Sequence, residues 1–399
     1  MNNQNQENNK HLEINDNFQR NIQALYIFNK VIGNFADEHD KTIHKSFADN
    51  LKKLLSPIEE ETDKDKKLSK KGKKELVKLI NSRVLEKEMK KIRKNAPIQG
   101  KLLRKSSLIS LMATFETFIS QIIQYYYQKF PKAFSSNSDK LSLEKIRELG
   151  SLEEAEQLLI SNEIDSLLRG NIQSQLDYFE KQLNIDLKPI QSYLEDLTEM
   201  SQRRNLLVHN DGIVNKQYLL KTPKKHLHKI KEGDKISINQ EYLLNSIKLI
   251  NTIGIILFQQ CFRKWEKDSI SNFNEILINI FYEALLEEDY KLIENLYNYI
   301  DSIDIKSDKE KRILVINYCI ALKEENKIDE MNTIIEQYDW SATSTDFNMA
   351  LAILKNENKQ AYKYIKQLLA SNDLDKESLH DWPIFKSLRE KKKFKKIIS

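Results

Sequence analysis

A short stretch near the middle of the chain gathers residue types that handle phosphates and protons. Arg204, Asn205 and His209 lie close together, and the turn-forming run Asn210-Asp211-Gly212 follows directly. That run predicts the end of a helix just after His209. Because a helix turns by about 100° per residue, Asn205 and His209 share one face, and the long side chain of Arg204 can reach the same place.

These three side chains together are suited to cleaving RNA without a metal ion. An imidazole, with an unperturbed pKa of about 6.5, can assist attack of a ribose 2′-hydroxyl on the adjacent phosphate. A guanidinium holds a phosphate through a planar fork of donors and stabilises the charge that develops there. The Asn205 amide would orient the ligand or the imidazole. One His supplies only one of the two proton-transfer groups that such a reaction uses, so we expect a two-fold homodimer with the site at its interface.

Two further residues are candidates for auxiliary roles. Arg203 would add a second phosphate contact, although a solvated helix Arg explains it equally well. Glu116 lies in a strongly apolar helical segment, where an unpaired carboxylate is costly. We expect Glu116 to reach the cleft and orient His209 or Arg204, or else to sit at the solvent edge of its helix or in a structural pair.

A basic segment follows the motif and is a candidate RNA-binding surface, with salt-sensitive affinity. Its residues are Lys221, Lys224, Lys225, His226, His228 and Lys229. No cysteine or carboxylate cluster accompanies the two histidines, so neither a metal site nor another cofactor is predicted. The net charge of +5, with 31% charged residues, does not by itself demonstrate a nucleic-acid partner.

The elements that would position these residues are predicted to be helices. Only eight Gly and six Pro are spread over long stretches rich in Leu, Ile, Lys, Glu and Gln, which favours an all-α fold. A wide apolar stripe between 108 and 123 predicts a core helix near 101–130. Further helices are expected near 142–148, 152–184, 188–209 and 240–264, with a small β-hairpin possible only within 218–238.

We predict three domains. Residues 1–98 form an N-terminal helical extension with a charged linker, in which Ser56-Pro57 ends the first helical run and a basic helix follows from 76 to 92. Residues 99–266 form a helical bundle. Residues 267–399 contain a faint repeat, in which Ala284, Ala321 and Ala352 begin similar helix ends at intervals of 37 and 31 residues. This region resembles tetratricopeptide-like helix pairs, although the Trp-Leu-Gly-Tyr consensus is absent.

At Arg204, Asn205 and His209 the sequence resembles the HEPN superfamily, whose motif is an Arg, a polar residue and a His at this spacing. The resemblance extends over roughly 101–264 and includes the Asn210-Asp211-Gly212 exit. It implies a dimerising helical bundle and, in many members, a metal-independent endoribonuclease of toxin–antitoxin or anti-phage systems. Arg204 and His209 would then be catalytic and Asn205 auxiliary. The C-terminal repeats would bind an antitoxin or a trigger protein.

Two alternatives keep the fold and change the function. Some members of the superfamily serve only as binding or scaffold modules, so the bundle could dimerise while the repeats recruit partners. The basic segment could instead make the protein a nucleic-acid-binding regulator without cleavage. We expect a cytoplasmic protein without a membrane partner, because the N-terminus has no secretory pattern and the apolar run 247–262 is short and interrupted by polar residues.

Overall fold

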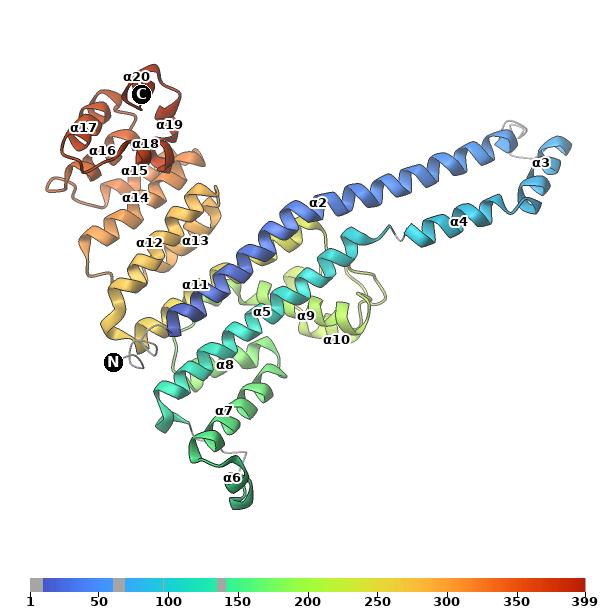
Figure 1. The fold of residues 1–399 in the computed structure, drawn as a ribbon, viewed down its shortest axis with the longest axis horizontal. Helices are drawn as coiled ribbons and strands as arrows, with labels where there is room; N and C mark the ends of the chain where they lie inside the picture. The colour runs from blue at the N-terminus through green and yellow to red at the C-terminus, as the bar shows by residue number, and fades with distance from the viewer. Residues whose placement is uncertain (1–9, 60–68, 96, 135–140, 399) are drawn as a thin grey trace. The chain divides into compact units, whose positions relative to one another are not determined.

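The computed structural model describes residues 10–59, 69–95, 97–134 and 141–398 (Figure 1). These residues are predominantly helical and form no strand, which confirms the all-α fold. Their one β-type pairing is an isolated antiparallel bridge between Ile213 and Lys235. The chain divides into two compact units: unit 1 comprises 1–184 and 191–254, and unit 2 comprises 185–190 and 255–399.

Two long helices form the spine of unit 1, α2 (Lys10–Glu59) and α5 (Gln99–Lys129), and they pack along each other (Figure 1). Phe18 of α2 stacks on Phe118 of α5 with ring centroids 4.1 Å apart. A Cβ on Gly254 would lie 2.2 Å from the Phe18 ring, so glycine permits this close approach. The apolar stripe predicted on α5 is confirmed, because every member is buried: Leu108, Leu111, Met112, Phe115, Phe118, Ile119, Ile122 and Ile123.

The N-terminal helices depart from the predicted boundaries. Helix α2 continues through Pro57, whose missing N–H would otherwise bond the carbonyl of Lys53. The Ser56 hydroxyl donates to that carbonyl at 3.2 Å, so the helix does not end there. The basic helix is two helices, α3 (Lys70–Asn81) and α4 (Val84–Asn95), separated where Arg83 has a φ of 54°.

The segment expected as one helix over 152–184 is also two, α7 (Leu152–Leu168) and α8 (Ile172–Lys181). Between them, Asn171 caps α8 by accepting a hydrogen bond from the Ser174 N–H at 2.9 Å. The short helix α6 (Leu143–Leu149) precedes them. A 3₁₀ turn, η2 (Lys188–Tyr193), leads into α9 (Leu194–His209), which packs on α5 and α8.

Residues 218–238, the only place where the sequence allows a β-hairpin, form no strand. The segment instead contains helix α10 (Lys216–Lys221) and a 3₁₀ turn, η3 (Lys224–His226), before α11 (Gln240–Trp265) begins. Asn215 caps α10 by accepting from the Tyr218 N–H at 2.9 Å. Tyr218 then packs with Leu206 and Val214 in a small apolar cluster, so the helical face rather than an alternating strand pattern is buried.

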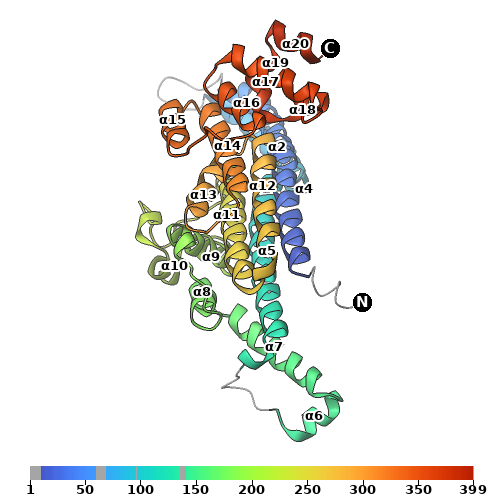
Figure 2. The ribbon, with the colours of Figure 1, turned by 90° about the vertical axis from the view of Figure 1, so that its left-hand side faces the viewer.

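Unit 2 is a succession of helix pairs (Figure 2). Its helices are α12 (Ile270–Leu286), α13 (Tyr290–Ile300), α14 (Asp308–Glu324), α15 (Ile328–Glu336), α16 (Thr345–Leu354), α17 (Asn358–Ala370), α18 (Lys376–Asp381), α19 (Lys386–Arg389) and α20 (Lys392–Ile398), with the 3₁₀ turns η4 (Lys267–Ser269) and η5 (Pro383–Phe385). Helix α14 packs on both α12 and α16, and α16 packs on α17.

The first three pairs of unit 2 share one turn. After α12, α14 and α16, a residue with positive φ reverses the chain: Glu288, Asn326 and Asn356. The following N–H bonds a carbonyl five residues earlier at 2.8 Å in all three places. In addition, the Lys323 ammonium donates to the carbonyl of Ile353 at 2.6 Å and to Asn356 Oδ1 at 2.9 Å, so α14 holds the turn that ends α16.

Two segments of the described chain are long and apolar enough to cross a membrane by length and composition, Val84–Lys129 and α11. Helix α11 has 26 residues, so the expectation that its apolar run is too short for a span does not hold. In its most apolar window, however, 61% of the residues are buried inside the protein, as in the core helix of a globular domain.

Candidate functional site

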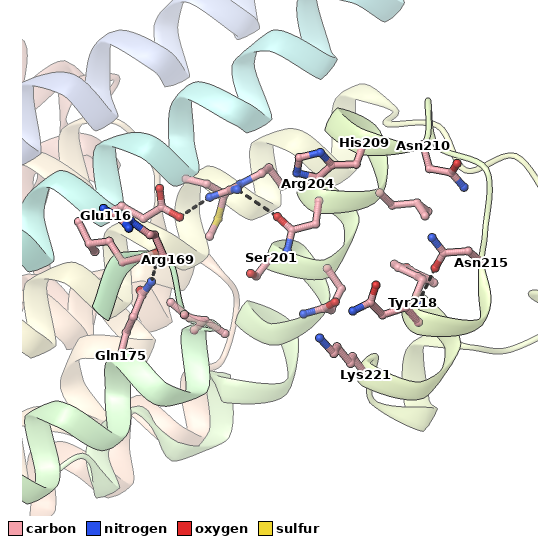
Figure 3. Close-up of a pocket in the computed structure, with 18 residues that line it drawn as sticks. Glu116, Arg169, Gln175, Ser201, Arg204, His209, Asn210, Asn215, Tyr218 and Lys221 are labelled. Carbon is pink, nitrogen blue, oxygen red and sulfur yellow. Dashed lines mark hydrogen bonds and ion pairs between the residues drawn. The ribbon is translucent and has the colours of Figure 1, made fainter. Parts of the chain in front are cut away.

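A pocket of about 410 Å³ lies against α9 in unit 1 (Figure 3). Its walls come from α5, the end of α7, α8, α9, and the segment through α10. All three motif residues, Arg204, Asn205 and His209, line it, as does the auxiliary candidate Glu116. The structure therefore brings together the residues that the sequence separates by almost ninety positions.

Arg204 has a fixed orientation at the centre of the pocket. It extends from α9 toward α5, where its Nη2 donates to Glu116 Oε1 (Figure 3). Its Nη1 donates to Asn205 Oδ1 at 3.0 Å. The Nε–H is buried and has no hydrogen-bond partner among the described residues. An unpaired buried donor is costly, and a ligand acceptor that reached this N–H would remove that cost.

Glu116 forms an ion pair with Arg204, although its partly buried position makes its carboxyl harder to ionise. Burial raises the pKa of its carboxyl above the ordinary value, and the opposing charge of Arg204 recovers only part of that effect. Burial therefore outweighs the ion pair in setting the pKa of this carboxyl. The pair holds the guanidinium of Arg204 against α5.

His209 lies in the last turn of α9 with an exposed side chain, as the turn signal predicts. The exit is closed by hydrogen bonds from the Asn210 and Gly212 N–H groups to the carbonyl of Leu206, at 2.9 and 3.1 Å. Gly212 has a φ of 80°, and a Cβ there would lie 2.5 Å from the Ile236 carbonyl oxygen. Glycine is thus required for the turn that leaves His209 at the pocket.

Arg203 does not line the pocket. Its guanidinium lies 4.1 Å above the Tyr242 ring, and its Nε donates to Glu199 Oε1 at 2.7 Å. Glu199 is 2% exposed and also accepts from the hydroxyls of Tyr218, at 2.9 Å, and Tyr242, at 2.7 Å. The structure therefore places Arg203 in a buried network that ties α9 to α10 and α11.

The basic segment is only partly directed at the pocket. Lys221 lines the pocket, whereas Lys225 and His226 face α9, where both approach Asp196 Oδ1, at 2.8 and 2.9 Å. The remaining members are exposed and are not among the pocket residues: Lys224, His228 and Lys229. Neutralised positions such as Lys225 offer less attraction to a phosphate backbone than their number in the sequence suggests.

The pocket also contains residues that the sequence did not single out. Arg169 and Gln175 enter because α7 ends at Leu168 and α8 begins at Ile172. Several amides join them: Gln202, Asn215 and Gln217. The available signal was Gly170-Asn171, a turn dipeptide inside the segment that was predicted as one continuous helix.

No known protein family, curated protein or solved structure matches this chain. Within the described ranges, no group of three or more His, Cys, Asp or Glu residues is placed to hold a metal ion. What the pocket can do therefore follows from its own residues: two guanidiniums and an exposed imidazole for an anionic ligand that exchanges a proton, and amides for a ligand with polar edges.

Proposed function

We propose that the protein is a metal-independent endoribonuclease of the HEPN type, with Arg204 and His209 as catalytic residues. The observation that supports this most is the convergence of Arg204, Asn205 and His209 in one pocket, with the buried Nε–H of Arg204 unpartnered among the residues described. A phosphate bound there satisfies this donor and meets an imidazole able to exchange a proton at cellular pH.

In this proposal His209 accepts the proton of a ribose 2′-hydroxyl as its oxygen attacks the adjacent phosphorus. The bond between phosphorus and the 5′-oxygen breaks, which leaves a 2′,3′-cyclic phosphate and a 5′-hydroxyl. Arg204 stabilises the charge on the phosphoryl oxygens, while Glu116 and Asn205 hold its guanidinium in position. The leaving 5′-oxygen needs a proton, which a second His209 across a homodimer interface would supply.

The wider setting is also part of the proposal. We place the enzyme in the cytoplasm as a toxin or anti-phage effector, with unit 2 binding an antitoxin or a trigger protein through its helix pairs. If two copies complete one site, the specific activity falls as the protein is diluted below the dissociation constant of the dimer. Constant specific activity across that range would contradict a shared site.

The decisive test is cleavage of RNA in EDTA by the wild type, His209→Ala and Arg204→Lys. We expect His209→Ala to reduce cleavage by about two orders of magnitude or more, and Arg204→Lys to reduce it because an ammonium lacks the planar fork. His228→Ala is the matched control, since this exposed histidine lies outside the pocket lining.

Product ends and modified substrates complete the test. Products should carry 2′,3′-cyclic phosphate and 5′-hydroxyl ends, and a 2′-deoxy substitution should block cleavage at that position. Cleavage that persists unchanged in His209→Ala would refute the assignment. A gel shift with intact RNA would instead favour a nucleic-acid-binding regulator.

A further inference from the structure

One end of the pocket, where α7 gives way to α8, contains a buried amide with an unused acceptor. Gln175 is 2% exposed, and its Oε1 has no hydrogen-bond partner within the described structure. Its Nε2 donates to the carbonyl of Leu168 at 3.5 Å. Exchanging the two amide atoms would turn the oxygen toward that carbonyl, so the free atom on this wall is an acceptor. A ligand with an N–H group would satisfy it.

The walls around Gln175 are suited to packing against the faces of a flat ring. Met112 is 1% exposed and Ile172 is 4% exposed, and both line the pocket with Leu168. Aliphatic and thioether side chains pack on ring faces, while a single polar group reads the ring edge. A wall of this composition contributes little to an extended phosphate backbone, which instead needs cations.

Two guanidinium groups, those of Arg169 and Arg204, lie next to the Gln175 end of the pocket. Figure 3 shows Gln175 and Arg169 on the Glu116 side of Arg204, whereas Asn215 and Lys221 lie on the other side. Arg169 is exposed and can contact a phosphate, and Arg204 carries the buried unpartnered Nε–H. A nucleotide whose base contacts Gln175 would therefore keep its phosphates within reach of guanidinium groups.

We propose that Leu168, Arg169, Ile172 and Gln175, together with Met112, form a base-recognition subsite for a nucleotide next to the scissile phosphate. The proposal rests on the RNA-cleaving function proposed above. Gln175 Oε1 accepts a hydrogen bond from an exocyclic amine, which adenine, cytosine and guanine carry and uracil lacks. The one N–H of the uracil ring lies between two carbonyl oxygens, a poor match for a wall whose free atom is an acceptor.

The first test compares oligonucleotides that carry or lack an exocyclic amine, on the wild-type protein. Oligonucleotides made wholly of adenosine are compared with those made wholly of purine riboside, which differs by the missing amine, and oligocytidine is compared with oligouridine. Wild-type protein should cleave the amine-bearing member of each pair faster by about tenfold or more, because the analogue leaves a buried acceptor unpaired. Affinity is measured in parallel by fluorescence anisotropy with the His209→Ala variant.

A pair of variants then assigns the preference to one residue. In Gln175→Leu the ratio of rates within each pair should fall to about one. Gln173→Leu makes the same chemical change at an exposed position of α8 and should keep the wild-type ratio. If Gln175→Leu does not fold, the ligand pairs still decide, because they are measured on the unmodified subsite.

The outcomes separate the subsite from the nuclease. Amine-dependent affinity without cleavage in the wild type would support the subsite and overturn the nuclease. Cleavage with equal rates and equal affinities within both pairs would overturn the subsite and leave the nuclease standing. A preference that persists in Gln175→Leu would show that another group reads the base, which also overturns the proposal.

Discussion

The buried network around Glu199 allows a quantitative prediction for Glu199→Ala. The carboxylate accepts hydrogen bonds from Arg203 Nε at 2.7 Å, from the Tyr218 hydroxyl at 2.9 Å and from the Tyr242 hydroxyl at 2.7 Å. Burial, and after it the charge of Glu199, raise the pKa of the Tyr218 hydroxyl to about 12. Removing the carboxylate leaves the largely buried Arg203 without its ion-pair partner, and it leaves two hydroxyls without their acceptor.

Breaking a buried ion pair by deleting one partner typically costs about 3–5 kcal/mol. The exposed fraction of the Glu199 side chain is 3% and that of Arg203 is 14%, so solvent screens this pair very little. Three charge-assisted hydrogen bonds taken separately would sum to more, but bonds to one acceptor are not additive. For a unit of this size, about 2–4 °C is lost per kcal/mol, so the unfolding midpoint should fall by roughly 6–20 °C.

Differential scanning calorimetry of the full chain measures this shift in the transition that includes unit 1. The matched control is Glu86→Ala, which removes a Glu–Lys pair between side chains that are 52% and 72% exposed. Its midpoint should match that of the wild type. A loss of less than about 2 °C in Glu199→Ala would refute the idea that this network holds α9 against α10 and α11.

Three further predictions concern the pocket and the core. Because burial raises the pKa of Glu116, its ionised form is less favourable in the folded state than in the unfolded state. Glu116→Gln should therefore raise the melting temperature at pH 7.5 while impairing RNA cleavage, and the gain should shrink as the pH falls toward the ordinary glutamate range; a lower melting temperature at pH 7.5 would contradict this sign. Gly212→Ala should destabilise unit 1 by about 1–3 kcal/mol in urea unfolding, because of its positive φ and its contact with the Ile236 carbonyl. Cys261 and Cys319 are free and buried, with thiol pKa values raised by burial, so neither should react with Ellman's reagent until the chain is unfolded; rapid labelling of the native protein would refute their burial.

Periodicity predicted the core far better than it predicted boundaries. The stripe on α5 was readable because eight apolar residues recur at helical spacing, and burial of that face leaves few other arrangements. The proline rule predicts a helix end at Pro57 because it does not include the Ser56 hydroxyl that compensates for the missing N–H. The break after α7 differs, because its signal, Gly170-Asn171, is local but lies within an otherwise continuous helical pattern.

The candidate site shows the same division between local and long-range information. The helix end at His209 was predictable from Asn210-Asp211-Gly212, a local signal. The contact of Arg203 with the Tyr242 ring was not, because another helix contributes Tyr242 and only tertiary packing brings it near. Lys225 looked available for RNA in the sequence, and only the fold reveals its ion pair with Asp196.

The hydrogen bonds from Lys323 to the end of α16 have a consequence for the evolution of unit 2. The Lys323 ammonium closes the turn of the next helix pair through the Ile353 carbonyl and the Asn356 side chain. A pair gained by duplication or lost by deletion would leave the partly buried Lys323 ammonium without its acceptors, or a helix end without its donor, unless the neighbouring pair changed as well. Helix pairs should therefore be inserted or exchanged without loss of stability only when α14, which carries Lys323, and α16, which Asn356 follows, stay together.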